Sequence, residues 1–175
     1  MLYGAHKAMV EQWVATQTRR GALRGLSLRL SGIVGRPRGA AGMKSSFLSD
    51  VFHAARLGKP FESPVGTSAT TWMMSLDRIV QDLSHGLAGD QASGEPFAIT
   101  LPSIRASMGE LIAEIARQRG MDPSFVRFAP DPALEATFGR FPPLDAAAAR
   151  AAGYTDDGSI QRLVAATFEH LQGEQ

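Results

Sequence analysis

The residues of this chain best suited to chemistry lie at its start, where Tyr3 and Lys7 are four positions apart. On a helix, this spacing places a phenol and an ammonium on the same face. A neighbouring cation stabilises a phenolate and lowers the pKa of a tyrosine, so that the phenol can exchange a proton with a carbonyl or an alcohol. The small residues Gly4 and Ala5 would leave room for a cofactor against this face. The alternative is a chance pair, because the pattern is short.

A helix over residues 3–19 is predicted to carry this pair. It ends before Gly21, a residue type favoured just after a helix C-terminus. The apolar residues of the segment recur at the spacing of an amphipathic helix. Met9 and Trp13 form a stripe beside the pair, and packing in the protein core is the favoured interpretation of both.

The next segment predicts a strand over residues 26–30 and a glycine-rich loop over residues 31–42. Glycines after a strand invite comparison with the loops that bind dinucleotides and phosphates. The glycine spacing is not G-x-G-x-x-G, however, and an extra residue separates Gly42 from Lys44, so the Gly-Lys-Ser order is absent. Both kinds of phosphate site are therefore excluded in this loop.

The rest of the chain alternates predicted strands and helices. Asp77 is expected to cap the helix that follows it. Strands are expected as a short pair within 65–74 and singly at 97–101 and 126–128, and helices at 45–57, 78–87, 107–119, 144–152 and 159–171.

Composition narrows the possible classes of protein. A chain of 175 residues, 44% hydrophobic and 20% charged, fits one globular domain or two small ones. It has no cysteine and no apolar run of the roughly 20 residues that span a bilayer, which is compatible with the cytoplasm. Its four histidines are far apart, so no metal site is expected.

Charge is unevenly distributed, because no acid lies between Glu11 and Asp50. One interpretation is a solvated basic face together with a helix C-terminus. Another is that Arg29, Arg36 or Arg38 holds an anionic cofactor or substrate. Nucleic-acid binding is disfavoured, because aromatic residues are not interleaved with the arginines as a stacking platform requires.

Three segments in this order carry a resemblance: YGAHKAMVEQWV, LSLRLSGIVGRPRG and the C-terminal run. They resemble the extended short-chain dehydrogenase/reductase family, the NAD-dependent epimerase/dehydratase group, and within it most nearly the D-erythronate dehydrogenases. The resemblance covers nearly the whole chain but only the C-terminal half of the family. It implies an α/β fold, namely the C-terminal part of a Rossmann-type NAD(P)-binding fold plus a small α/β substrate-binding domain. Residues 1–40 and about 70–90 would be the Rossmann remnant, and about 41–69 and 91–175 the substrate-binding domain.

The same resemblance implies a site for hydride transfer with NAD or NADP. Tyr3 would be the general acid/base and Lys7 its activator, and both would contact the cofactor together with Ile33. Three further residues, Ser46, Phe47 and Thr70, are candidates to face a small hydroxy acid or sugar derivative; capping and packing are the alternative for the first two. Many relatives have an arginine where this chain has threonine before Trp72. This difference favours a neutral polyol or a small sugar over an anion, or else indicates a site that has decayed.

The glycine-rich strand-turn-helix that binds pyrophosphate in this family has no counterpart here. We therefore expect a truncated product, a mis-set start or half of a split enzyme, inactive alone. The expected partners are a second copy through helix 3–19, or a missing N-terminal half, with no nucleic acid and no membrane. The alternative hypothesis is a non-catalytic module that docks through the first helix and the open edge of strand 26–30.

Overall fold

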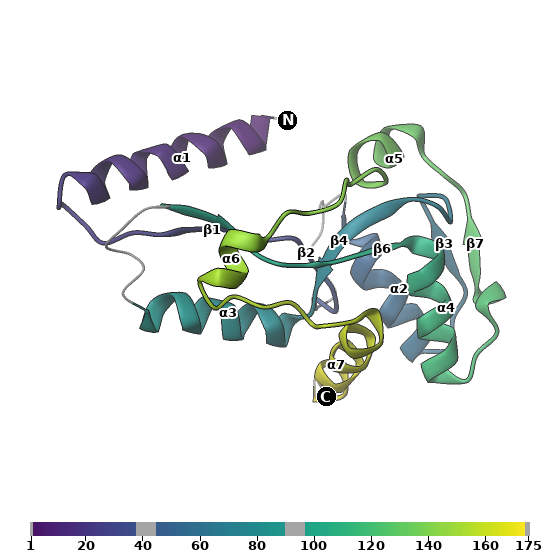
Figure 1. The fold of residues 1–175 in the computed structure, drawn as a ribbon. Helices are drawn as coiled ribbons and strands as arrows, with labels where there is room; N and C mark the ends of the chain where they lie inside the picture. The colour runs from purple at the N-terminus through teal and green to yellow at the C-terminus, as the bar shows by residue number, and fades with distance from the viewer. Residues whose placement is uncertain (1, 38–44, 90–96, 174–175) are drawn as a thin grey trace.

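The computed structural model describes residues 2–37, 45–89 and 97–173 (Figure 1). The end of the predicted glycine-rich loop, with Arg38, and most of the loop near residue 90 lie outside these ranges. Helices and strands follow one another as α1 (Leu2–Arg19), β1 (Ser27–Arg29), β2 (Gly32–Ile33), α2 (Phe47–Arg56), β3 (Phe61–Ser63), β4 (Thr70–Met74), α3 (Leu76–Ala88), β5 (Ala98–Thr100), β6 (Ile104–Ser107), α4 (Met108–Arg119), the 3-10 helix η2 (Pro123–Phe125), β7 (Val126–Phe128), α5 (Pro132–Phe138), α6 (Ala147–Ala151) and α7 (Ile160–Gly173).

The described strands form three small sheets. β1 pairs with β5 in parallel, with Ser27 opposite Ala98, and β3 pairs with β7 in parallel. β4 lies between β2, which is parallel to it, and β6, which is antiparallel. The predicted strand pair within residues 65–74 is therefore wrong, because that range holds β4 alone and its partners come from elsewhere in the chain.

Two hydrophobic clusters lie under these sheets. The larger packs α2, α4 and α7 around Phe52, Leu111 and Leu163. The smaller places residues of α3, β4, β5 and α6 beneath β1 and β2 around Leu101 and Tyr154. Ile99 and Leu101 thus share a cluster with the first strands, although the sequence predicted residues 91–175 to be part of the substrate-binding domain. The boundaries of that division stay a prediction.

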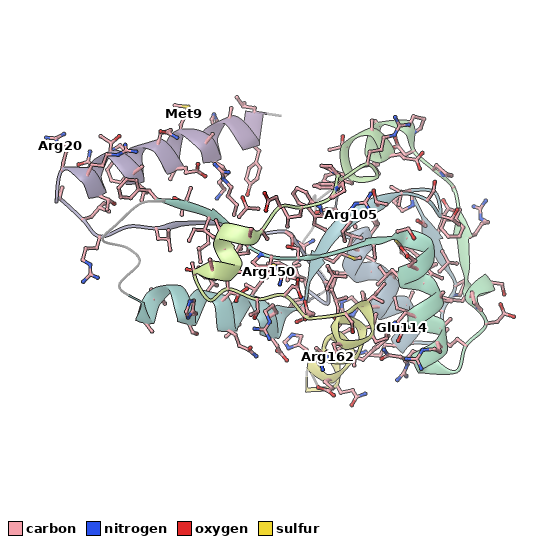
Figure 2. All side chains as sticks on the ribbon, viewed as in Figure 1. Met9, Arg20, Arg105, Glu114, Arg150 and Arg162 are labelled. Atoms are coloured by element: carbon pink, nitrogen blue, oxygen red, sulfur yellow. The ribbon has the colours of Figure 1, made fainter. Side chains whose placement is uncertain are left out.

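Helix α1 lies on one side of the β1–β5 pair, and α3 lies on the other (Figure 1). Of the residues of α1, all of which the structure describes, Ala15 alone is buried. Met9 and Trp13 are 68% and 58% exposed, so their predicted place in the core is wrong. Figure 2 shows Met9 on the side of α1 that points away from the other elements. The physical reason is that a sheet of two described strands covers only a narrow strip of the helix.

Helix caps fix where two central helices begin. Ser75 caps α3 by accepting the N–H of Arg78, so Asp77 lies in the first turn and is not the predicted cap. Ser107 and Glu110 form a capping box at the start of α4. Gly120 ends α4 with a φ of +62°, in the left-handed region that glycine adopts without strain.

A buried polar cluster joins α3 to the segment before α7. The Ser75 hydroxyl donates to Asp157 across 2.5 Å. Asp82 and Tyr154 are buried close by, and Asp82 Oδ2 and the Tyr154 hydroxyl have no partner in the part of the chain that the structure describes. Burial raises the pKa of Asp82, against smaller lowering effects of the Thr155 N–H and of Arg78 and His85. Burial, and then the Asp82 charge, also raise the pKa of Tyr154.

Asp82→Asn is expected to stabilise the protein more at pH 7 than at pH 4. Because the pKa of Asp82 is raised, the folded protein keeps its proton above about pH 4, where the unfolded chain has lost it, and stability falls as pH rises through the folded-state pKa. The neutral amide removes this loss. Urea unfolding at the two pH values measures the difference, with Asp77→Asn at an exposed position of the same helix as control. An equal effect of Asp82→Asn at both pH values would contradict the prediction.

Candidate active site

The structure brings Tyr3 and Lys7 together on the first two turns of α1. Lys7 Nζ lies over the Tyr3 ring, 5.5 Å from its centroid, which is within the range of a cation–π contact. Tyr3 is 69% exposed, so its hydroxyl is open to a ligand. The contact follows from the spacing of four residues, which stacks two side chains on one helix face. The catalytic roles of the two residues stay predictions.

A cavity of about 450 Å³ opens beside this pair. One wall is α1, through Tyr3, Lys7, Val10 and Glu11, and the other is formed by residues 27–30 of β1 and its end. The site therefore lies between a helix and the strand that follows it. In open α/β sheets, ligands bind outside the carboxyl ends of the strands, and this cavity reaches that end of β1.

An ion pair between Glu11 and Arg29 joins the two walls. Arg29 Nη2 lies 2.5 Å from Glu11 Oε1, and Arg29 Nε donates to Oε2 across 2.8 Å. The hydrogen bonds from Arg29 hold the pKa of Glu11 below its usual value, and Glu11 raises the pKa of Arg29. Arg29 was a candidate to hold an anionic ligand, and the structure shows its guanidinium bound to a carboxylate of the chain itself.

Glu11 was not among the site residues predicted from the sequence. Two signals in the sequence point to it: Glu11 follows Lys7 by four residues, on the same helix face, and it is the last acid before the long basic stretch. A carboxylate in that position is the nearest counter-charge for an arginine on the following strand.

The other predicted site residues lie away from this cavity. Ile33 is half-buried in β2, where its carbonyl accepts a hydrogen bond from Ser49. Ser46 precedes α2 and makes no side-chain cap. Phe47 is buried in the larger hydrophobic cluster, edge-on to Phe138. Ile33 and Phe47 fit packing roles, and the predicted contacts of all three residues with a cofactor or substrate stay untested.

Thr70 helps to hold the segment over residues 139–142 against β4. Its hydroxyl donates to the Phe141 carbonyl across 3.1 Å. Arg105 Nε donates to the same carbonyl, and Trp72 Nε1 donates to the Pro142 carbonyl. The Thr70 hydroxyl therefore forms a hydrogen bond within the fold, whereas the prediction from the sequence was that Thr70 faces the substrate.

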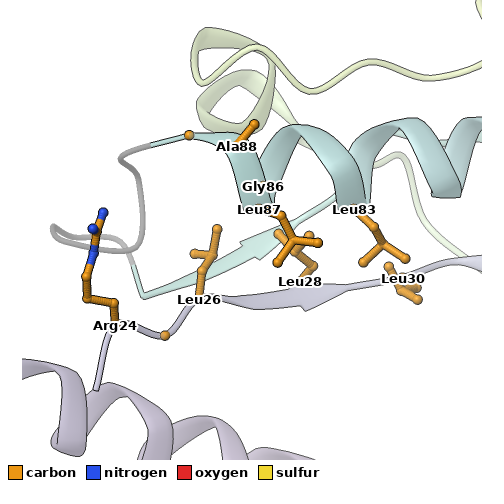
Figure 3. A pocket seen from close by; sticks show the side chains of 10 residues that line it. Arg24, Leu26, Leu28, Leu30, Leu83, Gly86, Leu87 and Ala88 are labelled. Atoms are coloured by element: carbon orange, nitrogen blue, oxygen red, sulfur yellow. The ribbon is translucent and has the colours of Figure 1, made fainter. Parts of the chain in front are cut away.

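An apolar groove lies on the other side of β1, between this strand and α3 (Figure 3). Its volume is about 790 Å³, and it is lined by leucines of both elements, with Leu26, Leu28 and Leu30 facing Leu83 and Leu87. Leu87 is 88% exposed. In the described part of the chain β1 pairs with β5 alone, and a strand edge beside exposed leucines is a surface that parallel α/β sheets normally cover.

Two kinds of site have no support in the described part of the chain. No three His, Asp or Glu residues gather there as a metal ion would require. No helix within these ranges is long and apolar enough to cross a membrane.

Sequence comparison finds relatives over nearly the whole chain, although no family model matches it. A D-erythronate dehydrogenase of Haemophilus influenzae is 24% identical over 174 residues, which are 96% of this chain and 54% of that protein. A D-erythronate dehydrogenase of Cupriavidus necator is 28% identical over 171 residues, which are 95% of this chain and 52% of that protein. The predicted resemblance is confirmed, and the chain spans about half the length of the curated relatives it matches.

Solved structures give the same picture of the fold. A nucleoside-diphosphate-sugar epimerase of Agrobacterium tumefaciens superposes with a TM-score of 0.86 and 26% identity, covering 99% of this chain and 52% of that one. An L-threonine 3-dehydrogenase of Trypanosoma brucei superposes with a TM-score of 0.84 and 19% identity, covering 98% and 53%. The predicted α/β class is confirmed: the fold is that of about half of a Rossmann-like dehydrogenase or epimerase.

Glu11→Gln is expected to loosen α1, because this helix has one buried residue and its ion pair with β1 would be lost. The Arg29 side chain is largely exposed, so the loss is expected to be at most about 1 kcal/mol, or several-fold faster hydrogen exchange of the α1 amides. Glu62→Gln is the matched control, because it breaks an exposed pair with Arg127 between β3 and β7. Equal exchange in both variants would show that the pair does not hold α1.

Proposed function

We propose that this chain supplies the Tyr3–Lys7 side of an NAD(P)-dependent oxidoreductase site that acts on a small hydroxy acid or sugar derivative. The observation that carries the proposal is the contact of Lys7 with the exposed Tyr3 ring beside a cavity at the carboxyl end of β1. Relatives named as dehydrogenases and a superposable epimerase support it. Localisation in the cytoplasm is part of the same proposal.

The residues present fit one end of a nicotinamide cofactor, NAD or NADP. The cavity beside the pair is of ligand size, and Lys7 Nζ at its wall is a donor suited to ribose hydroxyls. The bound cofactor would supply the hydride. Ile33, half-buried in the next strand, stays a proposed neighbour of the nicotinamide.

Tyr3 would move the proton in this reaction. Its exposed hydroxyl would give a proton to a carbonyl oxygen as the substrate carbon gains hydride, and its phenolate would take a proton from an alcohol as the carbon loses hydride. The Lys7 ammonium lies on the same helix face, over the Tyr3 ring. Glu11 acts indirectly, because its ion pair with Arg29 fixes the distance between α1 and β1.

Lys7→Ala is expected to abolish saturable enhancement of NADH fluorescence by the purified chain. The ammonium is the proposed contact to the ribose, and one charge-assisted hydrogen bond contributes about 1.5–3 kcal/mol, or roughly a tenfold or larger loss of affinity. Tyr3→Phe should keep binding, because only the hydroxyl is removed.

Lys59→Ala is the control for this titration, since it removes the same charge at an exposed position beyond α2. Each sample should first unfold cooperatively in a thermal melt. Enhancement that survives Lys7→Ala, or a folded chain that gives none, would contradict the proposed cofactor site in this chain.

A second candidate function is that of a docking module without catalysis. Leu2, Met9, Val10 and Trp13 are exposed on α1, and the leucine groove beside β1 is open as well. Apolar surface of this kind marks a protein–protein contact. We propose a second copy of the chain as the partner of α1, and an additional α/β segment, such as a separate N-terminal half, as the partner of the β1 edge.

Trp13→Glu is expected to convert a dimer into a monomer in sedimentation velocity, because it places a charge at the centre of the exposed α1 face. Val80→Glu is the matched control, since Val80 is a similarly exposed apolar residue on α3, the helix that borders the leucine groove. Dissociation by Val80→Glu alone would move the interface to α3. A wild-type chain that is monomeric at all concentrations would exclude self-association.

A further inference from the structure

One face of α3 is bonded to the segment over residues 152–157, which connects α6 to α7. The residues at the start and along the helix that make this contact recur every three or four positions, and they are Ser75, Arg78, Asp82 and His85. That spacing stacks the side chains along one side of the helix. The contact is therefore a single line of polar bonds, and separation of the segment from α3 breaks them all.

The two ends of this contact are closely bonded. At one end, the Ser75 hydroxyl donates to Asp157 Oδ1 across 2.5 Å, and the Ser75 N–H donates to Oδ2 across 3.1 Å. At the other end, His85 Nε2 donates to the Ala152 carbonyl across 2.8 Å. Gly153 follows with a φ of +88°, and a Cβ there would lie 2.9 Å from His85 Nε2. The close approach of the segment to α3 therefore requires a glycine at this position.

The middle of the contact holds three buried polar atoms that have no partner in the described part of the chain. They are Arg78 Nε, Asp82 Oδ2 and the Tyr154 hydroxyl. Arg78 Nη1 donates to the Thr155 hydroxyl across 2.7 Å, and the Thr155 N–H lies 3.5 Å from Asp82 Oδ1, at the limit of a hydrogen bond. A cationic donor and a carboxyl acceptor thus lie four residues apart on one helix, and each keeps an atom unbonded, although buried polar groups normally have partners.

This arrangement suits a protonated Asp82. The residue is 3% exposed, and an ionised carboxylate there would keep one charged oxygen shielded from solvent without a partner. Burial raises the pKa of Asp82, and the charge of Asp157 adds to this, against lowering effects of the Thr155 N–H and of Arg78 and His85. The closed contact therefore favours the neutral acid.

The other groups packed around Asp82 add no charge at neutral pH. Tyr154 is fully buried, and its ring lies edge-on to His85 with the ring centroids 4.9 Å apart. Burial, and then the Asp82 charge, raise the pKa of this phenol, so it stays neutral. Helix α7 packs against α3, and no residue of its described range 160–173 acts on the pKa of Asp82. The proton on Asp82 is thus controlled within the contact itself.

We propose that the contact between α3 and residues 152–157 is a proton-dependent switch, closed while Asp82 carries a proton and open when Asp82 is ionised and pairs with Arg78. The proton passes to solvent, and Arg78 leaves Thr155 for the carboxylate four residues along its own helix, a spacing at which opposite charges attract. Because the closed form holds the proton more tightly than the open form, the open form gains as pH rises.

Opening of this switch affects the leucine groove. Gly86 lines that groove, and a Cβ there would lie 3.0 Å from the Tyr154 hydroxyl and 3.4 Å from Leu28 of β1 (Figure 3). Tyr154 therefore supports the α3 wall of the groove from within the fold, and the wall loses this support when the segment separates. The switch requires neither Tyr3 nor Lys7, so it can be tested apart from the proposed cofactor site.

The test is NMR of the full chain carrying Tyr3→Phe and carbon-13 in its tyrosine rings, which leaves Tyr154 as the single tyrosine. A soluble paramagnetic compound broadens the signal of any ring that solvent reaches. The Tyr154 ring is expected to be shielded at about pH 4 and to become accessible as pH rises. The open population should grow by up to roughly tenfold for each pH unit between about pH 4 and the raised pKa of the closed form.

Two variants test the named groups. Asp82→Asn keeps an acceptor for the Thr155 N–H and has no proton to lose, so the Tyr154 ring should stay shielded over the whole pH range. Thr155→Val removes the hydroxyl that holds Arg78 in the closed form, so opening should begin at a lower pH. Asp77→Asn is the control, because Asp77 is exposed on the same helix and the pH dependence should be unchanged.

A third variant separates the two titratable side chains of α3 that take part. His85→Gln keeps an N–H donor for the Ala152 carbonyl, and the pH dependence should persist. Far-ultraviolet circular dichroism at each pH distinguishes local opening from unfolding of the whole chain.

Any of five outcomes would overturn the proposal. In the parent chain, they are a Tyr154 ring that stays shielded up to about pH 8, where a carboxyl of raised pKa has ionised, and exposure that comes only with loss of helical circular dichroism. In the variants, they are an equal rise of accessibility in Asp82→Asn, an unchanged opening pH in Thr155→Val, and loss of the pH dependence in His85→Gln.

Discussion

The ion pair between Glu11 and Arg29 joins the helix and the strand that frame the candidate active site. Helix α1 has one buried residue, and the side chains that carry the proposed chemistry line an open cavity. The position of Tyr3 relative to β1 therefore depends on few contacts. Because the Glu11 carboxylate accepts hydrogen bonds from two nitrogens of Arg29, the pair restrains the orientation of α1 relative to β1 as well as the distance between them.

Sequence periodicity predicted the helices well, and predicted the strands and burial less well. The capping box at Ser107 and the stop signal at Gly120 are local, which is why α4 begins and ends within a residue of the prediction. Strand pairing is not local, so the partners of β3 and β4 could not be read from the alternation of residues. Met9 and Trp13 have the spacing of core residues, but their burial depends on how many strands lie beneath α1, which no spacing within the helix reveals.

In the candidate site, too, local contacts could be predicted from the sequence and contacts between distant segments could not. The contact between Tyr3 and Lys7 follows from their spacing alone. The pairing of Glu11 with Arg29 crosses two elements, and the bond of Thr70 to Phe141 joins segments far apart in the chain, so both needed the fold.

The parallel pairing of β1 with β5 also has a kinetic consequence. The two strands are far apart along the chain, and closing so long a loop costs entropy before any contact compensates it. Helix α4 and the strand before it, by contrast, are consecutive in sequence and can form early. We expect the carboxyl ends of β1 and β5 to meet after these local elements have formed. Until then β1 has no fixed place beside α3, and the leucine groove between the two elements is incomplete.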